Sequence, residues 1–289
     1  MNRLRTAQNP ITVADVASRI HASLGVAWNA AAGDGLQAGR PDTPVTGIAT
    51  AWTPSLDVLR RAVTAGANMI VTRECAFWSR ETAITGYSGA GATTTRKDMT
   101  ADPTFAFKQS FIEKNDLALW RLSGNWDARQ DDAQLANLVT ALGWQTYQAD
   151  RPGRVTLPRT SMSDLAARIR TALGARALRV LGDAAAPIRT VALTHGFLLV
   201  PEVQTIVRDA SVDVIVGGEP VEWEAFPYVA DLVTAGRVKG MILLGHAVSE
   251  EPGSRAVAEW LATLVTEVPV RFLPAGEPFW TPAMTGTRG

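Results

Sequence analysis

Polar side chains that could do chemistry follow four apolar stretches that we predict to be strands. The carboxyl ends of parallel strands are the usual ligand positions of open α/β sheets. The side chains found there are Arg73, Glu74 and Cys75 after the first stretch, Ser123, Asn125 and Asp127 after the second, Glu219 after the third, and His246 and Glu250 after the fourth. These strand ends are therefore the candidate site.

His246 and Glu250 have the most informative spacing of this set. They are four positions apart, so they share a face if that turn is helical. An imidazole and a carboxylate on one face can meet a single metal ion. The carboxylate-rich surroundings favour Zn, Mn, Fe or Mg over a structural zinc site. The alternative, which is commoner for a lone pair of this kind, is a hydrogen bond at a helix end.

The other candidates also have simpler interpretations. Glu74 and Arg73 together can be a charge pair at the rim of a site. His195, which follows a predicted strand, can be a core or loop histidine as well as a site residue. Cys75 fits a small buried residue better than a nucleophile, because no histidine stands near it in the sequence. The glycines around residue 90 lack the frame of a phosphate-binding loop.

The sequence contains two predicted strand–helix–strand units, one over residues 45–74 and one over residues 188–219. Their similar lengths, each ending in a glutamate, indicate an internal duplication. We therefore predict an α/β fold with two similar α/β halves packed around a central cleft, divided as residues 1–150 and 151–289. Residues 151–158 are the expected linker, and residues 79–100, which lack an apolar period, are the expected long loop. Further helices are expected over residues 12–24, 105–114, 131–142, 223–235 and 254–265, with a last strand over residues 270–273.

Composition excludes several classes of protein. The 289 residues carry 28 basic and 28 acidic side chains, so the formal net charge is zero. This balance argues against a nucleic-acid or membrane partner, since both require a basic surplus. A single cysteine excludes a disulfide framework. No apolar stretch approaches the ~20 residues that span a bilayer, and no signal peptide is visible, so we expect a soluble, cytoplasmic protein.

Several motifs, in this order, resemble a known family. They are Gly33-Asp-Gly-Leu-Gln37, Ala67-Asn-Met-Ile-Val-Thr-Arg-Glu-Cys-Ala-Phe-Trp78, Ala118-Leu-Trp-Arg-Leu-Ser-Gly-Asn-Trp-Asp127, Val212-Asp-Val-Ile-Val-Gly-Gly-Glu219 and Leu244-Gly-His-Ala-Val-Ser-Glu250. Over nearly the whole chain the sequence is similar to the NGG-interacting-factor-three-like proteins. This is the dinuclear metal centre family, whose members are also labelled GTP cyclohydrolase I type 2 homologues.

The resemblance implies a two-metal site between two α/β halves and a ring-like homohexamer with its sites facing an inner cavity. His246 and Glu250 match ligand positions of the family, with Glu250 as a bridging carboxylate, and Asp127 matches a ligand aspartate. Glu74 stands where the family has a histidine or a glutamate ligand. The implied cofactor is therefore a divalent metal, one or two ions of Zn, Mn or Fe.

Three positions depart from the family pattern. Arg73 and Ser123 stand where histidines are expected, and Asn125 replaces a histidine found in some branches. An arginine stays protonated at any working pH and cannot ligate a cation. Arg73 could instead bind a substrate carboxylate or phosphate, with Ser123, Asn125 and His195 as further substrate contacts.

Two functions remain open. The first is a metal-dependent hydrolase that cleaves a C–N bond of a small cyclic or amide-like substrate. In it Glu219 or Glu250 takes a proton, Arg73 holds an anionic group and the loop at 79–100 closes over the site. The second is a non-catalytic, ring-shaped binding or regulatory protein whose metal site has degenerated. A third hypothesis, a nucleic-acid-associated factor, is disfavoured by the zero net charge.

Overall fold

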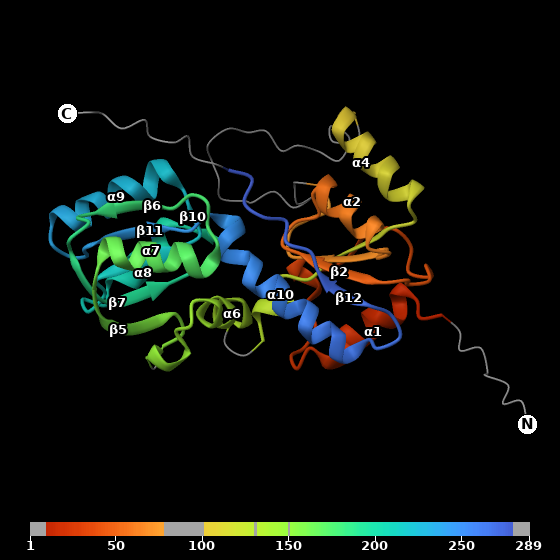
Figure 1. Cartoon of the computed structure of the whole chain (residues 1–289), viewed down its shortest axis with the longest axis horizontal. Helices are drawn as coiled ribbons and strands as arrows, with labels where there is room; N and C mark the ends of the chain where they lie inside the picture. Colours follow the sequence, from red (N-terminus) through yellow and green to blue (C-terminus); the bar gives the residue numbers. More distant parts are fainter. Residues whose placement is uncertain (1–9, 78–100, 130–131, 150, 280–289) are drawn as a thin grey trace, which may run out of the picture. The chain divides into compact units, whose positions relative to one another are not determined.

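The computed structural model describes residues 10–77, 101–129, 132–149 and 151–279. The chain divides into two compact units (Figure 1). Unit 1 comprises residues 1–129 and 254–275, and unit 2 comprises residues 130–253 and 276–289. This division differs from the boundary predicted at residue 150, because residues 130–149 join the second unit and a later segment returns to the first.

Unit 1 is built on a five-stranded sheet in the order β1-β4-β3-β2-β12. The strands are β1 (Gly35–Ala38), β2 (Ile48–Ala51), β3 (Met69–Thr72), β4 (Ala118–Arg121) and β12 (Val270–Phe272). All neighbours are parallel except β1, which runs antiparallel to β4. The residues of β2, β3 and β4 are buried throughout, as expected for strands covered on both faces.

Helices cover the two faces of this sheet. They are α1 (Val13–Ser23), α2 (Leu56–Thr64), α4 (Pro103–Lys114), the short α5 (Gly124–Asp127) and the C-terminal part of α10 (His246–Leu264), with a 3-10 turn at Ala30–Ala32. Leu59 of α2 and Ile112 of α4 pack with Ile70 of β3 on one face. On the other face, Thr50 donates a hydrogen bond to the carbonyl of Ser254 in α10. Helix α1 begins with a capping box, in which the side chains of Thr12 and Asp15 each accept the backbone N–H of the other residue.

Unit 1 contains a buried lysine in α4. The side chain of Lys108 donates a hydrogen bond to the carbonyl of Ala76 and lies 5.6 Å from the ring centroid of Phe77. Burial lowers the pKa of Lys108 to about 8. Since an unfolded lysine keeps its proton to about pH 10.4, the unfolded state binds more protons between these two values. The stability of the parent should therefore rise with pH across that window.

Replacing Lys108 by methionine should stabilise the protein at neutral pH. The pKa change corresponds to about 3 kcal/mol, and loss of the hydrogen bond to Ala76 offsets about 1 kcal/mol of it. We expect a net gain of about 2 kcal/mol at about pH 7, shrinking toward about pH 10, in urea unfolding. Lys114→Met, at an exposed position of the same helix, is the control. Equal effects of the two substitutions would contradict the prediction.

Unit 2 is also built on a five-stranded sheet, in the order β5-β7-β9-β11-β6. The strands are β5 (Arg154–Ser161), β6 (Arg179–Gly182), β7 (Pro187–Leu193), β9 (Val214–Gly217) and β11 (Gly240–Leu243). The central β7, β9 and β11 are parallel, and the two edge strands are antiparallel. A small second sheet pairs β8 (Phe197–Leu198) with β10 (Glu219–Pro220).

The helices of unit 2 lie on both faces of its sheet (Figure 1). They are α6 (Ala133–Ala141), α7 (Met162–Leu173), α8 (Val200–Val207), α9 (Glu222–Thr234) and the start of α10, with a 3-10 turn at Gln145–Tyr147. Val214 and Val216 of β9 pack with α6 and α7. Ile215, between them, packs with α8 and α9. This alternation is the period of two that places successive strand residues on opposite faces.

The two units repeat one topology. In each, three parallel strands follow one another in sequence order, β2-β3-β4 in unit 1 and β7-β9-β11 in unit 2. In each, a strand that precedes these three in the chain pairs antiparallel with the third of them. The predicted α/β class with two similar halves is thereby confirmed, while the cleft between the halves stays a prediction.

Some predicted elements were wrong. The expected linker at residues 151–158 is largely β5, whose register shifts between Thr156 and Thr160. This irregularity accommodates Pro158, a residue that sheets tolerate at edges and bulges. The last long helix begins at His246, not at Ser254. The predicted loop at 79–100 lies outside the described residues. Among the residues that are described, no helix is both long and apolar enough to span a membrane.

Candidate functional site

The strand ends of unit 2 bring together the predicted histidines and glutamates. His195 follows β7, Glu219 follows β9, and His246 follows β11 as the first residue of α10. Because these three strands are parallel, their carboxyl ends lie along one edge of the sheet. His246 and Glu250 both lie in α10, so the helical spacing predicted for them is confirmed.

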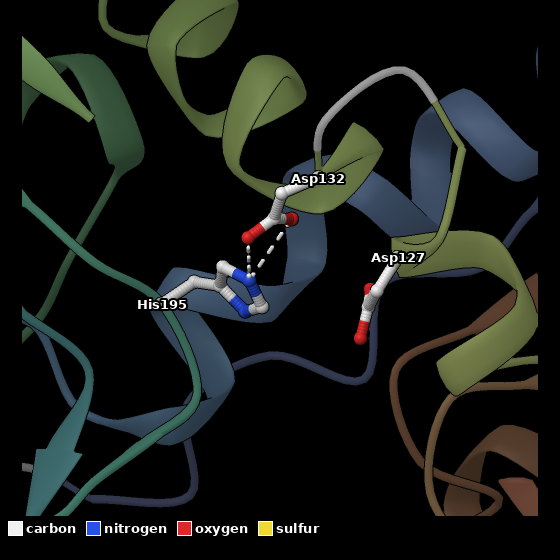
Figure 2. Close-up of side chains that lie close together, drawn as sticks. All are labelled: Asp127, Asp132 and His195. Carbon is white, nitrogen blue, oxygen red and sulfur yellow. Dashed lines mark hydrogen bonds and ion pairs between the residues drawn. The ribbon is translucent and has the colours of Figure 1, made fainter. Parts of the chain in front are cut away.

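His195 lies between two carboxylates. Its Nδ1 is 3.1 Å from Oε1 of Glu250, and its Nε2 is 3.0 and 3.2 Å from the two carboxylate oxygens of Asp132. Figure 2 shows the ring facing Asp132, with both contacts to that carboxylate dashed. The Glu250 side chain is 1% exposed, that of His195 14% and that of Asp132 35%. The imidazole therefore bridges a buried acid and a more accessible one.

This arrangement favours the charged imidazolium. Burial by itself would lower the pKa of His195, but the hydrogen bonds to Asp132 and Glu250 and the charges of both carboxylates raise it to about 9. Two acceptors, one at each ring nitrogen, require both nitrogens to donate, which only the protonated ring can do. In the metal-free protein His195 is thus a cation at neutral pH.

The backbone beside His195 is shaped for this contact. Gly196 has φ of +59°, and a Cβ added there would collide with Oε1 of Glu250. The hydroxyl of Ser249 accepts the Gly196 N–H at 3.0 Å and donates to the carbonyl of His246 at 2.8 Å. Only glycine both adopts this conformation readily and leaves room for the carboxylate. The loop after β7 is therefore held against the first turn of α10.

His246 and Glu219 form a second histidine–carboxylate pair in unit 2. Nδ1 of His246 lies 3.4 Å from Oε2 of Glu219, whose side chain is 59% exposed. Glu219 also begins β10, where its N–H donates to the carbonyl of Gly196 at 2.7 Å. Glu219 therefore presents an accessible carboxylate next to the loop that carries His195.

The strand ends of unit 1 are dominated by an ion pair. Arg73, after β3, donates from both terminal nitrogens to the two carboxylate oxygens of Asp127, at 2.6 and 2.9 Å. Ser123 is buried at the start of α5. Glu74 is partly buried, and its N–H donates to the carbonyl of Trp52. The chain thus places a guanidinium on the carboxylate that the resemblance implies as a metal ligand.

Asn125 has a structural position. Its Oδ1 accepts the N–H of Asn29 at 2.7 Å, and its Nδ2 donates to the Asn29 carbonyl and to Asp34. Asp34 also accepts the Asn125 N–H and pairs at 2.9 Å with Arg121, and the Asp34 and Arg121 side chains are 0% and 2% exposed. This buried network holds α5. The substrate-contact roles predicted for Ser123 and Asn125 stay predictions.

The residues of unit 1 do not fit a pair of metal ions. Arg73 contributes no ligand, and it engages both oxygens of Asp127. The oxygen and nitrogen donors of Asp132 and His195 in unit 2 do fit one divalent ion of the Zn, Mn or Fe type, while Glu250 holds the ring from its other nitrogen. Asp132 and His195, both in unit 2, are side chains of ligand type whose donor atoms lie close enough together to share an ion.

Sequence reasoning missed Asp132. In the structure this residue is the N-cap of α6, where its Oδ1 accepts the N–H of Leu135 at 2.9 Å. An aspartate before an apolar helix is the ordinary signature of an N-cap, so the residues around Asp132 do not indicate its contact with His195. The one unusual feature is a backbone φ of +78°, which only the structure reveals.

Comparisons with known proteins agree with this fold. The family model Duf34/NIF3 (NGG1p interacting factor 3) matches residues 3–102 and 104–278. The solved structure of Staphylococcus aureus protein SA1388 is similar with a TM-score of 0.67 and 17% identity, over 95% of this chain and 100% of that one.

Two further solved structures have the same fold. A Bacillus cereus protein related to NIF3 has a TM-score of 0.67 and 14% identity, over 95% of this chain and 100% of its own. Protein ybgI, described as of unknown function, has a TM-score of 0.64 and 23% identity, over 93% and 100%. No functionally curated protein matches. Because the family model matches nearly the whole sequence, this chain belongs to the Duf34/NIF3 family.

Proposed function

We propose that the chain is a metal-dependent hydrolase that cleaves a C–N bond of a small cyclic or amide-like substrate. The observation that carries the proposal is the placement of His195 between Asp132 and Glu250 at the strand ends of unit 2. One divalent ion held by Asp132 and His195, with Glu250 orienting the ring from its Nδ1 side, would supply a water whose pKa is lowered toward about 7.

The residues of this chain then have distinct roles. His195 gives up a ring proton so that the freed nitrogen can donate to the ion. Glu250, buried at the first turns of α10, fixes the ring from its Nδ1 side. Glu219 is the accessible carboxylate for proton transfer, and His246 at 3.4 Å orients it. The substrate, the number of ions and the assembly into a hexamer remain part of the proposal.

Elemental mass spectrometry of protein purified without chelator or nickel tests the metal. We expect about one ion per chain, lost in Asp132→Asn and in His195→Gln, while His21→Gln in unit 1 keeps it. A screen of cyclic amides and nucleotides, with and without chelator, then tests hydrolysis. Equal metal in the parent and in both site variants, or none after incubation with Zn, Mn and Fe, would overturn the proposal.

The contact between Arg73 and Asp127 favours a second candidate. If the guanidinium takes the place of a metal on Asp127 and the residues of unit 2 hold none either, the chain is a non-catalytic binding or regulatory protein. In that case the parent would hold no metal and no variant would change any turnover. Arg73→His distinguishes the two, because it removes the guanidinium from Asp127 and adds an imidazole, and a gain of bound metal would identify Arg73 as the group that excludes the metal.

A further inference from the structure

Arg129 in unit 1 is held by two tryptophans. Its guanidinium carbon lies 4.6 Å from the ring of Trp126 and 4.7 Å from the ring of Trp260. The two rings are themselves 5.4 Å apart and inclined by 55°. Trp126 belongs to α5 and Trp260 to α10, so two helices of the unit fix one side chain. Because the three distances are similar, both rings lie on one side of the guanidinium, and its other side is left for hydrogen bonds from its N–H groups.

The charge of Arg129 is unbalanced within the described part of the chain. Its side chain is partly buried, and burial lowers its pKa. Among the described residues no carboxylate pairs with it, and Asp127, two positions earlier, is engaged by Arg73. A cation partly withdrawn from water without a counter-charge carries a desolvation cost, and contacts with aromatic rings offset part of that cost. An anion at the N–H edge would supply what is missing.

We propose that Arg129 binds an oxyanion, the carboxylate or phosphate group of a ligand. Both groups offer two oxygens at the spacing of the guanidinium fork and accept a bidentate pair of hydrogen bonds. The tryptophans hold the fork in one orientation before the ligand arrives, which lowers the entropy lost on binding. The site lies in unit 1 and requires neither a metal ion nor hydrolysis. Its test is therefore independent of the function proposed above.

The test is a titration of the ¹⁵N-labelled full chain with inorganic phosphate, and separately with acetate, at constant ionic strength. We expect saturable shifts of the indole N–H signals of Trp126 and Trp260. A shift with phosphate alone or with acetate alone identifies the group. In Arg129→Met the affinity should fall by about 10-fold or more, because a charge-assisted hydrogen bond is lost.

Two further variants make the outcome decisive. Arg255 also lies over an aromatic ring, 4.5 Å from that of Phe272, but its side chain is exposed. Arg255→Met should therefore bind as the parent does. Arg129→Lys keeps the charge without the fork and should bind more weakly than the parent, which also covers the case in which Arg129→Met fails to fold. Unsaturable shifts in the parent, or undiminished binding in both Arg129 variants, would overturn the proposal.

Discussion

Asp34→Ala is expected to destabilise unit 1 by about 3–5 kcal/mol, the usual loss when one partner of a buried ion pair is removed. The side chain of Asp34 is fully buried and lies 2.9 Å from that of Arg121, which is 2% exposed. The substitution leaves that guanidinium in the protein interior without its carboxylate. It also removes the acceptor for the N–H and the side-chain amide of Asn125. Helix α5 should therefore lose its hydrogen bonds to Asp34 together with the ion pair.

Hydrogen exchange gives a readout confined to one unit. Amides of β4 and α5 should lose protection in Asp34→Ala, while those of β9 in unit 2 keep it. The control is Asp57→Ala, since Asp57 pairs with Arg61 at 2.8 Å but is 73% exposed. An exposed pair contributes less than about 1 kcal/mol. A loss of protection in Asp34→Ala no larger than in the control would contradict the ion pair's role.

The local part of the site could be predicted from the sequence, and the long-range part could not. The spacing of four between His246 and Glu250 is a property of one helix, and that prediction is confirmed. The contact of His195 with Glu250 joins residues 55 positions apart, and that of Arg73 with Asp127 joins residues 54 apart. Such contacts follow from strand order in the sheet, which no short motif encodes.

The same distinction holds for the fold. The buried strands β3 and β9 are apolar runs, and each lies near the end of a strand–helix–strand unit that the sequence predicts. The edge strands β1 and β6 were missed, because their residues are mostly accessible and carry no apolar period. Helix α10 continues through Pro252 and Gly253, which usually end helices. Gly253 is needed there because a Cβ would collide with the side chain of Gln134, a constraint that is visible only after folding.

His195→Gln is expected to remove a pH-dependent part of the stability of unit 2. The folded-state pKa of His195, about 9, lies above its ordinary value of 6.5. A raised histidine pKa contributes stability that is fully present below the unfolded value and is lost as pH rises through the folded value. The shift corresponds to about 3 kcal/mol. At about pH 6 the metal-free variant should be less stable than the parent by that amount, and by about pH 10 the difference should shrink.

Denaturant unfolding of metal-free protein at both pH values measures this difference, and His21→Gln in unit 1 should leave the parent's pH dependence unchanged. The same slope in the parent and in His195→Gln would mean that the carboxylates do not hold a proton on the ring. If the slope is lost, the proton and the proposed metal compete for one imidazole. Metal binding below about pH 9 would then release about one proton from His195. Because a merely structural ion pair releases none on metal addition, proton release measured with the metal distinguishes a metal site from a salt bridge.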